Sequence, residues 1–395
     1  MRIEDILQRE MADGLAEIHA TRLQLIFAAT CALLRSGKAT LTSIGRAIAT
    51  GTTQKHGIKR ADRLLGNQNI HRERPRIFAA IARKVIAPGS RPVVIVDWTD
   101  FSNKMWSLVA AVSFEGRAVT IYSETHPVSR YLKPAVHRAF LRKLRQVLPA
   151  GCTPIILTDA GFRSPWMKEV SRLGWDYVCR LRGLNRLREP GRIGWSKLIH
   201  FFERMGKGAR DFGTCELGLR ALFKTRVVGF SKRRRSQNWR EKWGKLSRTN
   251  HHKQLRSARE PWILATSLKC SPNKVVALYR RRMQIEETFR DSKSANLGLS
   301  MEHARTKRPA RADILMLLIS LAHLLSLVAG FVAEACKLDR AFQANTLRKR
   351  RVLSVCKLGR LLLAREGAHR FSRAEITAAW RTLSERVFLY RWSEI

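Results

Sequence analysis

The sequence predicts an α/β protein with a mixed-sheet core, a helical N-terminal domain, a β-rich insertion and C-terminal helices. Two short apolar runs that each lead into an aspartate, residues 93–97 and 155–159, are typical of buried central strands. Long segments before and after them carry apolar residues at three- and four-residue spacing, which indicates helices. A chain of 395 residues has room for two or three domains.

The charge of the chain points to its partner. The 75 Lys and Arg residues exceed the 31 Asp and Glu residues by 44, while 45% of all residues are hydrophobic. Such a chain folds, but it repels itself unless it meets a polyanion, and nucleic acid is the usual one. The composition argues against a small-molecule enzyme of central metabolism, a secreted disulfide scaffold and a disordered basic tail.

Several features favour the cytoplasm, with association to the nucleoid. The seven cysteines are scattered without a CxxC pair, so we expect reduced thiols and no structural zinc site. His251-His252 lies in a basic polar stretch that reads as a solvated loop, and the N-terminus lacks a signal-peptide core. Residues 314–332 are apolar over nearly the length that spans a bilayer, but they include His323. We expect a buried core helix there and no membrane partner.

Residues 1–88 are expected to form a helical DNA-binding domain. Two short helices, 41–48 and 55–65, flank a Gly/Thr break, and the second is rich in basic residues. This pattern suits a helical module that reads DNA, with Lys59, Arg60 and Arg63 as contacts. A solvated basic helix face would give the same pattern.

Residues 89–182 predict the first part of the core. The expected elements are a strand at 92–97, a hairpin of 106–113 and 117–123, a helix at 135–148, a strand at 154–159, a helix at 165–173 and a strand at 175–181. Three meandering strands followed by helix, strand, helix and strand is the order of an RNase H-like domain.

Residues 183–260 interrupt this pattern and predict a basic, partly β insertion. The runs 232–235 and 239–243 mix basic residues with tryptophan, which favours nucleic-acid contact over a merely solvated loop. Residues 261–335 return to the core, with a strand at 261–266 and a long helix from about 273 to 293. Further helices fill 336–395, where Ser372 and Glu375 form a capping-box signature.

Two acidic residues lie at the expected strand ends. Asp97 and Asp159 can converge on a hard cation such as Mg²⁺, and Mn²⁺ is a possible substitute. Two such ions, roughly 3.5–4 Å apart, can activate an attacking oxygen and stabilise a leaving one. A strand-end aspartate also caps turns, so each residue has a structural alternative. Asp100 ranks second to Asp97 because we expect it to lie past the strand.

The third carboxylate comes from the long helix. Tyr279, Arg282, Glu286 and Lys293 fall on one narrow face at about 100° per residue. That face offers a carboxylate for metal, two cations for phosphates and a tyrosine. A solvated salt-bridge stripe is the alternative, but it needs neither the tyrosine nor the basic excess.

The spaced residues Tyr279, Arg282, Glu286 and Lys293 resemble the YREK signature of a large group of bacterial insertion-sequence transposases. The blocks 97–100, 159–162 and 279–293 resemble that group too, and the similarity runs over most of the chain.

The resemblance implies that Asp97, Asp159 and Glu286 are the DDE triad that binds two divalent ions. It also implies cleavage of each transposon end through a hairpin and joining to target DNA, with inverted-repeat ends paired by a homodimer. Trp262 matches the tryptophan that receives a flipped base, although a core aromatic is an equal alternative. Tyr279 and Arg282 would then hold the flipped nucleotide's phosphate, and Lys293 the backbone near the cut.

Two rival functions stay open. A catalytically silent DNA-binding protein would need no carboxylates facing phosphates. An RNase H-like nuclease without strand transfer would not need the complete signature or the large basic insertion. We therefore expect a cut-and-paste transposase.

Overall fold

A computed structural model describes residues 10–11, 14–48, 51, 53–102, 104–183, 185–218, 222–231, 260–294, 298–343, 352–364 and 370–389. The chain divides into two compact units, each of which is described by itself: residues 1–154 with 283–395, and residues 155–282. The basic runs at 232–235 and 239–243 and the pair His251-His252 lie outside the described residues.

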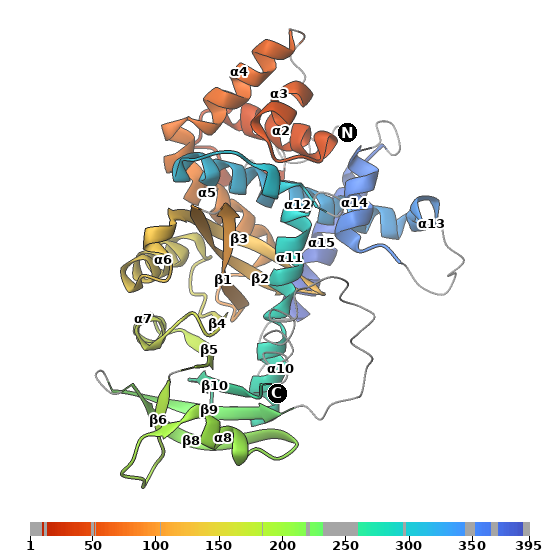
Figure 1. Ribbon diagram of the computed structural model, residues 1–395. Coiled ribbons are helices and arrows are strands. Elements are labelled where there is room, and N and C mark those ends of the chain that lie inside the picture. Colours follow the sequence, from red (N-terminus) through yellow and green to blue (C-terminus); the bar gives the residue numbers. More distant parts are fainter. Residues whose placement is uncertain are drawn as a thin grey trace, which may run out of the picture. The chain divides into compact units, whose positions relative to one another are not determined.

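The first unit begins with helices that include α2 (Ala20–Ser36), α3 (Leu41–Ala47), α4 (Gln54–Leu65) and α5 (Gln68–Val85) (Figure 1). The two short helices expected at 41–48 and 55–65 are therefore present. They cross at a pair of glycines, since a Cβ on Gly57 would lie 2.2 Å from the Gly45 carbonyl oxygen. Only a residue without a side chain permits backbones this close.

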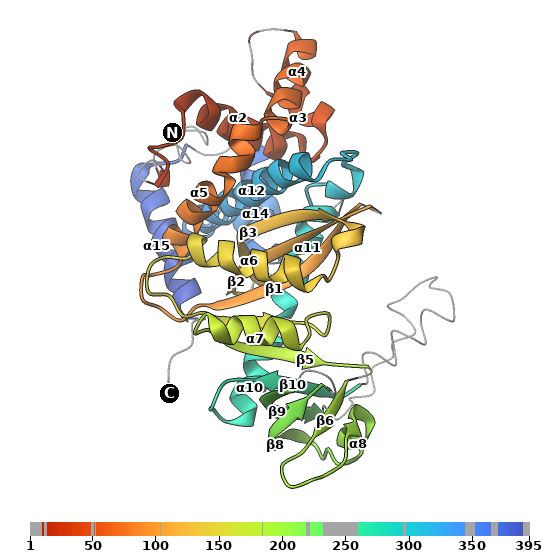
Figure 2. The same ribbon diagram turned by 90° about the vertical axis from the view of Figure 1, so that its left-hand side faces the viewer.

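Three antiparallel strands of the sheet follow, in the order β3-β2-β1. They are β1 (Val93–Ser102), β2 (Met105–Phe114) and β3 (Arg117–Pro127). The expected hairpin turn at Glu115-Gly116 is confirmed, with Gly116 at a φ of 72°. Helix α6 (Pro134–Val147) lies on one face of this sheet and α11 (Met283–Lys293) on the other (Figures 1 and 2).

The C-terminal helices cover the same unit. They are α12 (Pro309–Ala335), α13 (Asp339–Phe342), α14 (Val355–Ala364) and α15 (Arg373–Leu389). The capping box is confirmed, because Ser372 N donates to Glu375 Oε2 (2.7 Å) and Glu375 N donates to Ser372 Oγ (3.2 Å).

Helix α12 is the apolar segment that the sequence singles out. It is long and apolar enough to cross a membrane, yet 94% of its most apolar window is buried inside the protein. It packs against α14, β3, α15 and α2. This burial agrees with the expectation of a core helix. All seven cysteines are free thiols, as the sequence predicts.

A buried ion pair joins three of these elements. Arg74 of α5 donates to Asp313 Oδ2 of α12 (2.8 Å), and its other nitrogen donates to the Ser123 carbonyl of β3 (2.6 Å). Asp313 also accepts from the Thr125 backbone N–H (2.6 Å) and contacts His71 Nε2 (3.0 Å). The side chains of Arg74 and Asp313 are only 4% and 7% exposed, so water does not solvate the two charges. The hydrogen bonds above stabilise them instead.

The described residues of the second unit form seven strands in the order β4-β5-β10-β9-β8-β6-β7. Among the strand pairs described for this unit, β4 and β5 are the only parallel pair, and the others are antiparallel. Its elements are β4 (Ile155–Thr158), α7 (Ser164–Arg172), β5 (Asp176–Leu181), β6 (Arg186–Arg188), β7 (Ser196–Lys197), α8 (Leu198–Glu203), β8 (Gly208–Leu217), β9 (Phe223–Ser231), β10 (Trp262–Thr266) and α10 (Pro272–Arg280). The chain order β1-β2-β3-α6-β4-α7-β5 confirms the mixed α/β class with an RNase H-like core.

Gly57→Ala tests the close crossing of α3 and α4. The new methyl group would push against backbone, and such overpacking costs about 1–3 kcal/mol, more than the helix propensity that alanine adds. We expect a lower midpoint in urea unfolding. Gly206→Ala is the matched control, because no atom lies within 4 Å of a Cβ there. Equal stability of the two variants would contradict the crossing.

Candidate active site and nucleic-acid interface

Asp97 lies in the middle of β1, not at its end. The expected strand stops at residue 97, but β1 continues to Ser102 because β2 supplies a pairing partner for each residue up to Asp100. Asp97 is 8% exposed, and its Oδ1 accepts a hydrogen bond from the Trp98 backbone N–H (2.8 Å). The carboxylate is therefore buried and oriented by its own strand.

Asp100 also lies within β1, so the expectation that it follows the strand is wrong. Its side chain is 57% exposed and forms an ion pair with Lys293 Nζ of α11. Residues three apart on a strand point to opposite faces, so the side chains of Asp97 and Asp100 lie on opposite faces of β1. Asp100 is therefore paired with Lys293 of α11, whereas Asp97 is the buried carboxylate of β1.

Trp98 anchors the same strand. Its indole N–H donates to His137 Nε2 of α6 (3.1 Å), and its ring packs edge-on against Tyr131 with centroids 5.3 Å apart. Burial lowers the pKa of His137 to about 4, so the imidazole is neutral near pH 7 and can accept this bond. The sequence offered no role for Trp98; the structure gives it this packing role.

The single long helix predicted from about 273 to 293 is wrong. Helix α10 ends at Arg280, and α11 begins at Met283. Arg281 N and Arg282 N each bond the carbonyl three residues back, at 3.0 Å, so the last turn tightens and the helix stops. Residues therefore share a face only within each helix. Glu286 and Lys293 share a face of α11, while Tyr279 lies in the last turn of α10 and Arg282 lies between the two helices.

Helix α11 is fixed to the β2–β3 turn by a row of polar side chains. Gln284 Oε1 accepts from the Phe114 backbone N–H (2.9 Å). Thr288 Oγ1 accepts from the Ala118 N–H (2.9 Å) and donates to its carbonyl (3.1 Å). These residues are four apart and share one face, which sets the rotation of the helix that carries Glu286.

Asp159 directly follows β4, as the sequence predicts. Its Oδ1 accepts from the Gly161 backbone N–H (2.9 Å), so this aspartate also closes the turn after the strand. Within the second unit, Asp159 acts electrostatically on the Tyr279 hydroxyl and raises its pKa. The carboxylate is therefore near enough to Tyr279, in the last turn of α10, to act on its hydroxyl.

Trp262 and Tyr279 form an aromatic pair in the second unit. Their ring centroids are 5.0 Å apart at 74°, and the ring centroid of Phe230 is 5.5 Å from that of Trp262. Trp262 is half-buried, while Ile263, Leu264 and Ala265 beside it are fully buried. Burial raises the pKa of Tyr279 to about 12, so its hydroxyl keeps its proton and is a hydrogen-bond donor at neutral pH.

Two guanidinium groups complete this cluster. Arg282 and Arg180 of β5 both lie near enough to Tyr279 to lower its pKa, against the larger effect of burial. Arg180 Nε is buried without a hydrogen-bond partner in the described part of the chain, and Nη2 is 3.7 Å from Glu260 Oε2. Sequence reasoning missed Arg180. The available signal was an arginine inside the otherwise apolar run Tyr177 to Leu181.

The proposed DNA contacts on α4 lie on the surface. Lys59, Arg60 and Arg63 are exposed, and none of them forms an ion pair with another described residue. Their side chains are therefore available to a phosphate backbone.

No group of three or more His, Cys, Asp or Glu side chains with metal-binding geometry occurs among the described residues. Asp97 and Glu286 belong to the first unit and Asp159 to the second. The carboxylate oxygens of these three residues suit a hard cation, because Mg²⁺ prefers carboxylate ligands. Asp97 and Asp159 are each oriented through Oδ1 by a backbone N–H.

Comparison with known families assigns the chain. Residues 88–323, more than half of the sequence, match the family described as a transposase DDE domain. The chain belongs to this DDE transposase family. Comparison with curated proteins finds no match. A DDE transposase is a DNA-cleaving enzyme of transposition and recombination, which agrees with the excess of positive charge and with the RNase H-like order of elements.

Thr288→Val tests how firmly α11 is held. Valine keeps the shape but leaves the buried Ala118 N–H without a partner, which costs about 1–3 kcal/mol. We expect a lower unfolding midpoint by calorimetry, and Thr288→Ser should retain most of the wild-type stability. A Thr288→Val protein as stable as the wild type would contradict the proposed fixing of the helix.

Proposed function

We propose that this DDE transposase moves DNA by a cut-and-paste route with a hairpin intermediate. It would bind inverted-repeat transposon ends, cleave them and join them to target DNA. The proposal places the chain in the YREK-signature group, near the transposase of the tetracycline-resistance composite transposon. The observation that supports it most is the cluster of Trp262, Tyr279, Arg180 and Arg282 beside Asp159. A simple nuclease has no need for an aromatic pair with two cations near its tyrosine.

Asp97, Asp159 and Glu286 are the proposed catalytic carboxylates and ligands of two divalent ions. Support comes from the family, from the buried setting of Asp97 and from the fixed rotation of α11. Bound Mg²⁺, or Mn²⁺ in its place, would activate the attacking oxygen and stabilise the leaving one. The carboxylates bind and orient, while the surrounding cations hold the DNA in place.

The aromatic pair suits an extruded base. A hairpin bends one strand sharply across a blunt end, so a base must leave the stack. Half-buried Trp262 offers a stacking surface, and the Tyr279 hydroxyl and the Arg282 and Arg180 guanidinium groups are donors for the adjacent phosphate. Lys293, paired with Asp100 in the free protein, would exchange that partner for the backbone near the cut.

The remaining assignments follow from the same proposal. Lys59, Arg60 and Arg63 of the helical domain at 1–88 would contact transposon-end DNA. The insertion at 183–260 would interrupt a core made of residues 89–182 and 261–335, followed by C-terminal helices at 336–395. We expect a homodimer in the paired-end complex and a cytoplasmic, nucleoid-associated protein.

Substituting each carboxylate separates cleavage from binding. Asp97→Ala, Asp159→Ala or Glu286→Ala should abolish Mg²⁺-dependent cleavage of end DNA and leave end binding largely intact, because Lys and Arg contact the backbone. Gel assays of nicking and of binding measure the two steps. Substantial cleavage by Glu286→Ala protein would reject the triad. Activity of Asp97→Ala together with loss in Asp100→Ala would reassign the first aspartate.

Trp262→Ala distinguishes transposition from plain nuclease activity. Loss of a stacking partner costs roughly 1–3 kcal/mol, which is about ten- to a hundredfold in rate at the hairpin steps. First-strand nicking precedes the distortion and should be spared. A gel time course on labelled end DNA should show accumulated nicks and few hairpins.

Trp262→Phe is the matched control because it keeps an aromatic face. Equal loss of nicking and hairpin formation in Trp262→Ala would make Trp262 a core residue only. An undiminished hairpin yield would mean that the extruded base stacks elsewhere.

A further inference from the structure

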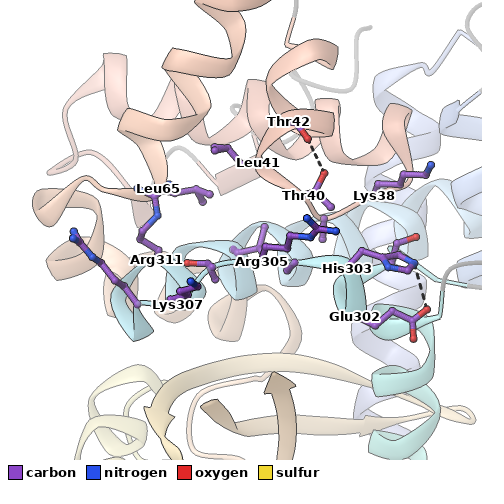
Figure 3. A pocket seen from close by; sticks show the side chains of 16 residues that line it. Lys38, Thr40, Leu41, Thr42, Leu65, Glu302, His303, Arg305, Lys307 and Arg311 are labelled. Atoms are coloured by element: carbon purple, nitrogen blue, oxygen red, sulfur yellow. Dashed lines mark hydrogen bonds and ion pairs between the residues drawn. The ribbon is translucent and has the colours of Figure 1, made fainter. Parts of the chain in front are cut away.

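A basic groove of about 1350 Å³ lies in the first unit, apart from the residues proposed above for chemistry. One wall is the turn between α2 and α3, and the other is the segment that joins α11 to α12 (Figure 3). Along it stand Lys38 near one end, Arg305 in the middle, and Lys307 and Arg311 toward the other end.

The cations of the groove are poorly neutralised. Lys38, Arg305, Lys307 and Arg308 are exposed, and none of them forms an ion pair with another described residue. Glu302 is the one acidic residue among the described lining, and its carboxylate is 3.8 Å from His303 Nε2. The groove therefore concentrates positive potential that only an added anion can offset.

The walls of the groove are fixed in advance. The Ala39 backbone N–H donates to the Leu299 carbonyl (2.7 Å), and Ser300 Oγ donates to the Gly37 carbonyl (3.2 Å). Ser300 is buried at a φ of 54°, a left-handed conformation that a serine holds only when its surroundings demand it. Because the walls of the groove are already ordered, binding a ligand does not carry the entropic cost of ordering them.

The groove continues past the proposed DNA-binding helix. A second cavity of about 330 Å³ shares Leu65, Arg308 and Arg311 with it and extends to Arg72. Leu65 is the last residue of α4, and Arg311 of α12 pairs with Asp62 of α4 at 2.6 Å. A polyanion held on α4 would therefore meet the groove at the end of that helix.

The lining favours a sugar–phosphate backbone over a small molecule or splayed bases. Its volume exceeds the roughly 300–1,000 Å³ of small-molecule pockets, which are mostly apolar. None of its described lining residues is Phe, Tyr or Trp, so unstacked bases find no stacking surface. Thr306 Oγ1 is a buried hydroxyl with no hydrogen-bond partner among the described residues, and it can donate to a phosphate oxygen.

We propose that this groove holds the phosphate backbone of transposon-end DNA as a second contact site beyond α4, with Lys38, Arg305 and Lys307 as its phosphate-binding residues. The inference rests on the proposed function, because it assumes that end DNA is the ligand of the helical domain. Contacts with the backbone would position the end between the helix that recognises it and the segment that leads from α11.

The test is the salt dependence of end binding. Each phosphate contact contributes about −0.9 to the slope of log K against log salt. Fluorescence anisotropy with a labelled end duplex, over a series of KCl concentrations, gives the slope for Lys38→Ala, Arg305→Ala and Lys307→Ala. We expect each variant to lower the magnitude of the slope by about 1. Lys38→Arg should keep the wild-type slope.

Arg381→Ala is the matched control, since Arg381 is an exposed arginine of α15 in the same unit and does not line the groove. Groove variants with the slope of Arg381→Ala protein would overturn the proposal, provided that thermal melting shows all of them folded. Cleavage by Glu286→Ala protein would reject the catalytic proposal without changing these slopes, so the two failures are distinguishable.

Discussion

The buried ion pair between Asp313 and Arg74 is the interaction on which the first unit depends. The carboxylate of Asp313 binds Arg74 of α5 and the backbone of β3, and Arg74 also reaches Ser123. Breaking a buried ion pair of this kind costs about 3–5 kcal/mol, because one charge is left without compensation. Helix α5 leads back to α4, and β3 belongs to the sheet that carries Asp97. One charge pair therefore supports both the proposed DNA-binding helix and the sheet that carries Asp97, a proposed catalytic residue.

The second constraint is charge. At one acidic residue per cation, 31 acidic residues leave 44 of the 75 Lys and Arg residues without an acidic partner. Some of the acidic residues that do pair join elements distant in sequence, such as Asp291 with Arg117 (2.6 Å) and Asp62 with Arg311 (2.6 Å). What remains is unpaired positive charge on α4 and along the groove. Binding of DNA then relieves self-repulsion as well as serving function, since a ligand that binds only the folded state stabilises it.

The interruption between α10 and α11 organises the candidate chemistry. Tyr279 and Arg282, at the end of α10 and just after it, lie near Trp262 and Arg180. Glu286 and Lys293 lie on α11, which is bonded to the β2–β3 hairpin through Thr288 and to Asp100 through Lys293. Each half of the signature is thus oriented by its own neighbours. The aromatic and cationic half suits holding a nucleotide, and the acidic half suits phosphoryl transfer.

The sequence by itself determined the element order of residues 89–182, the hairpin, the capping box and the candidate carboxylates, because each depends on spacing within one segment. Only the tertiary structure decided that β1 runs past Asp97, since its length depends on pairing with β2. It also broke the predicted long helix, added Arg180 to the Tyr279 cluster and formed the groove between Lys38 and Arg305. The Tyr279 cluster and the groove join residues distant in the chain, and neither periodicity nor composition records which distant residues meet.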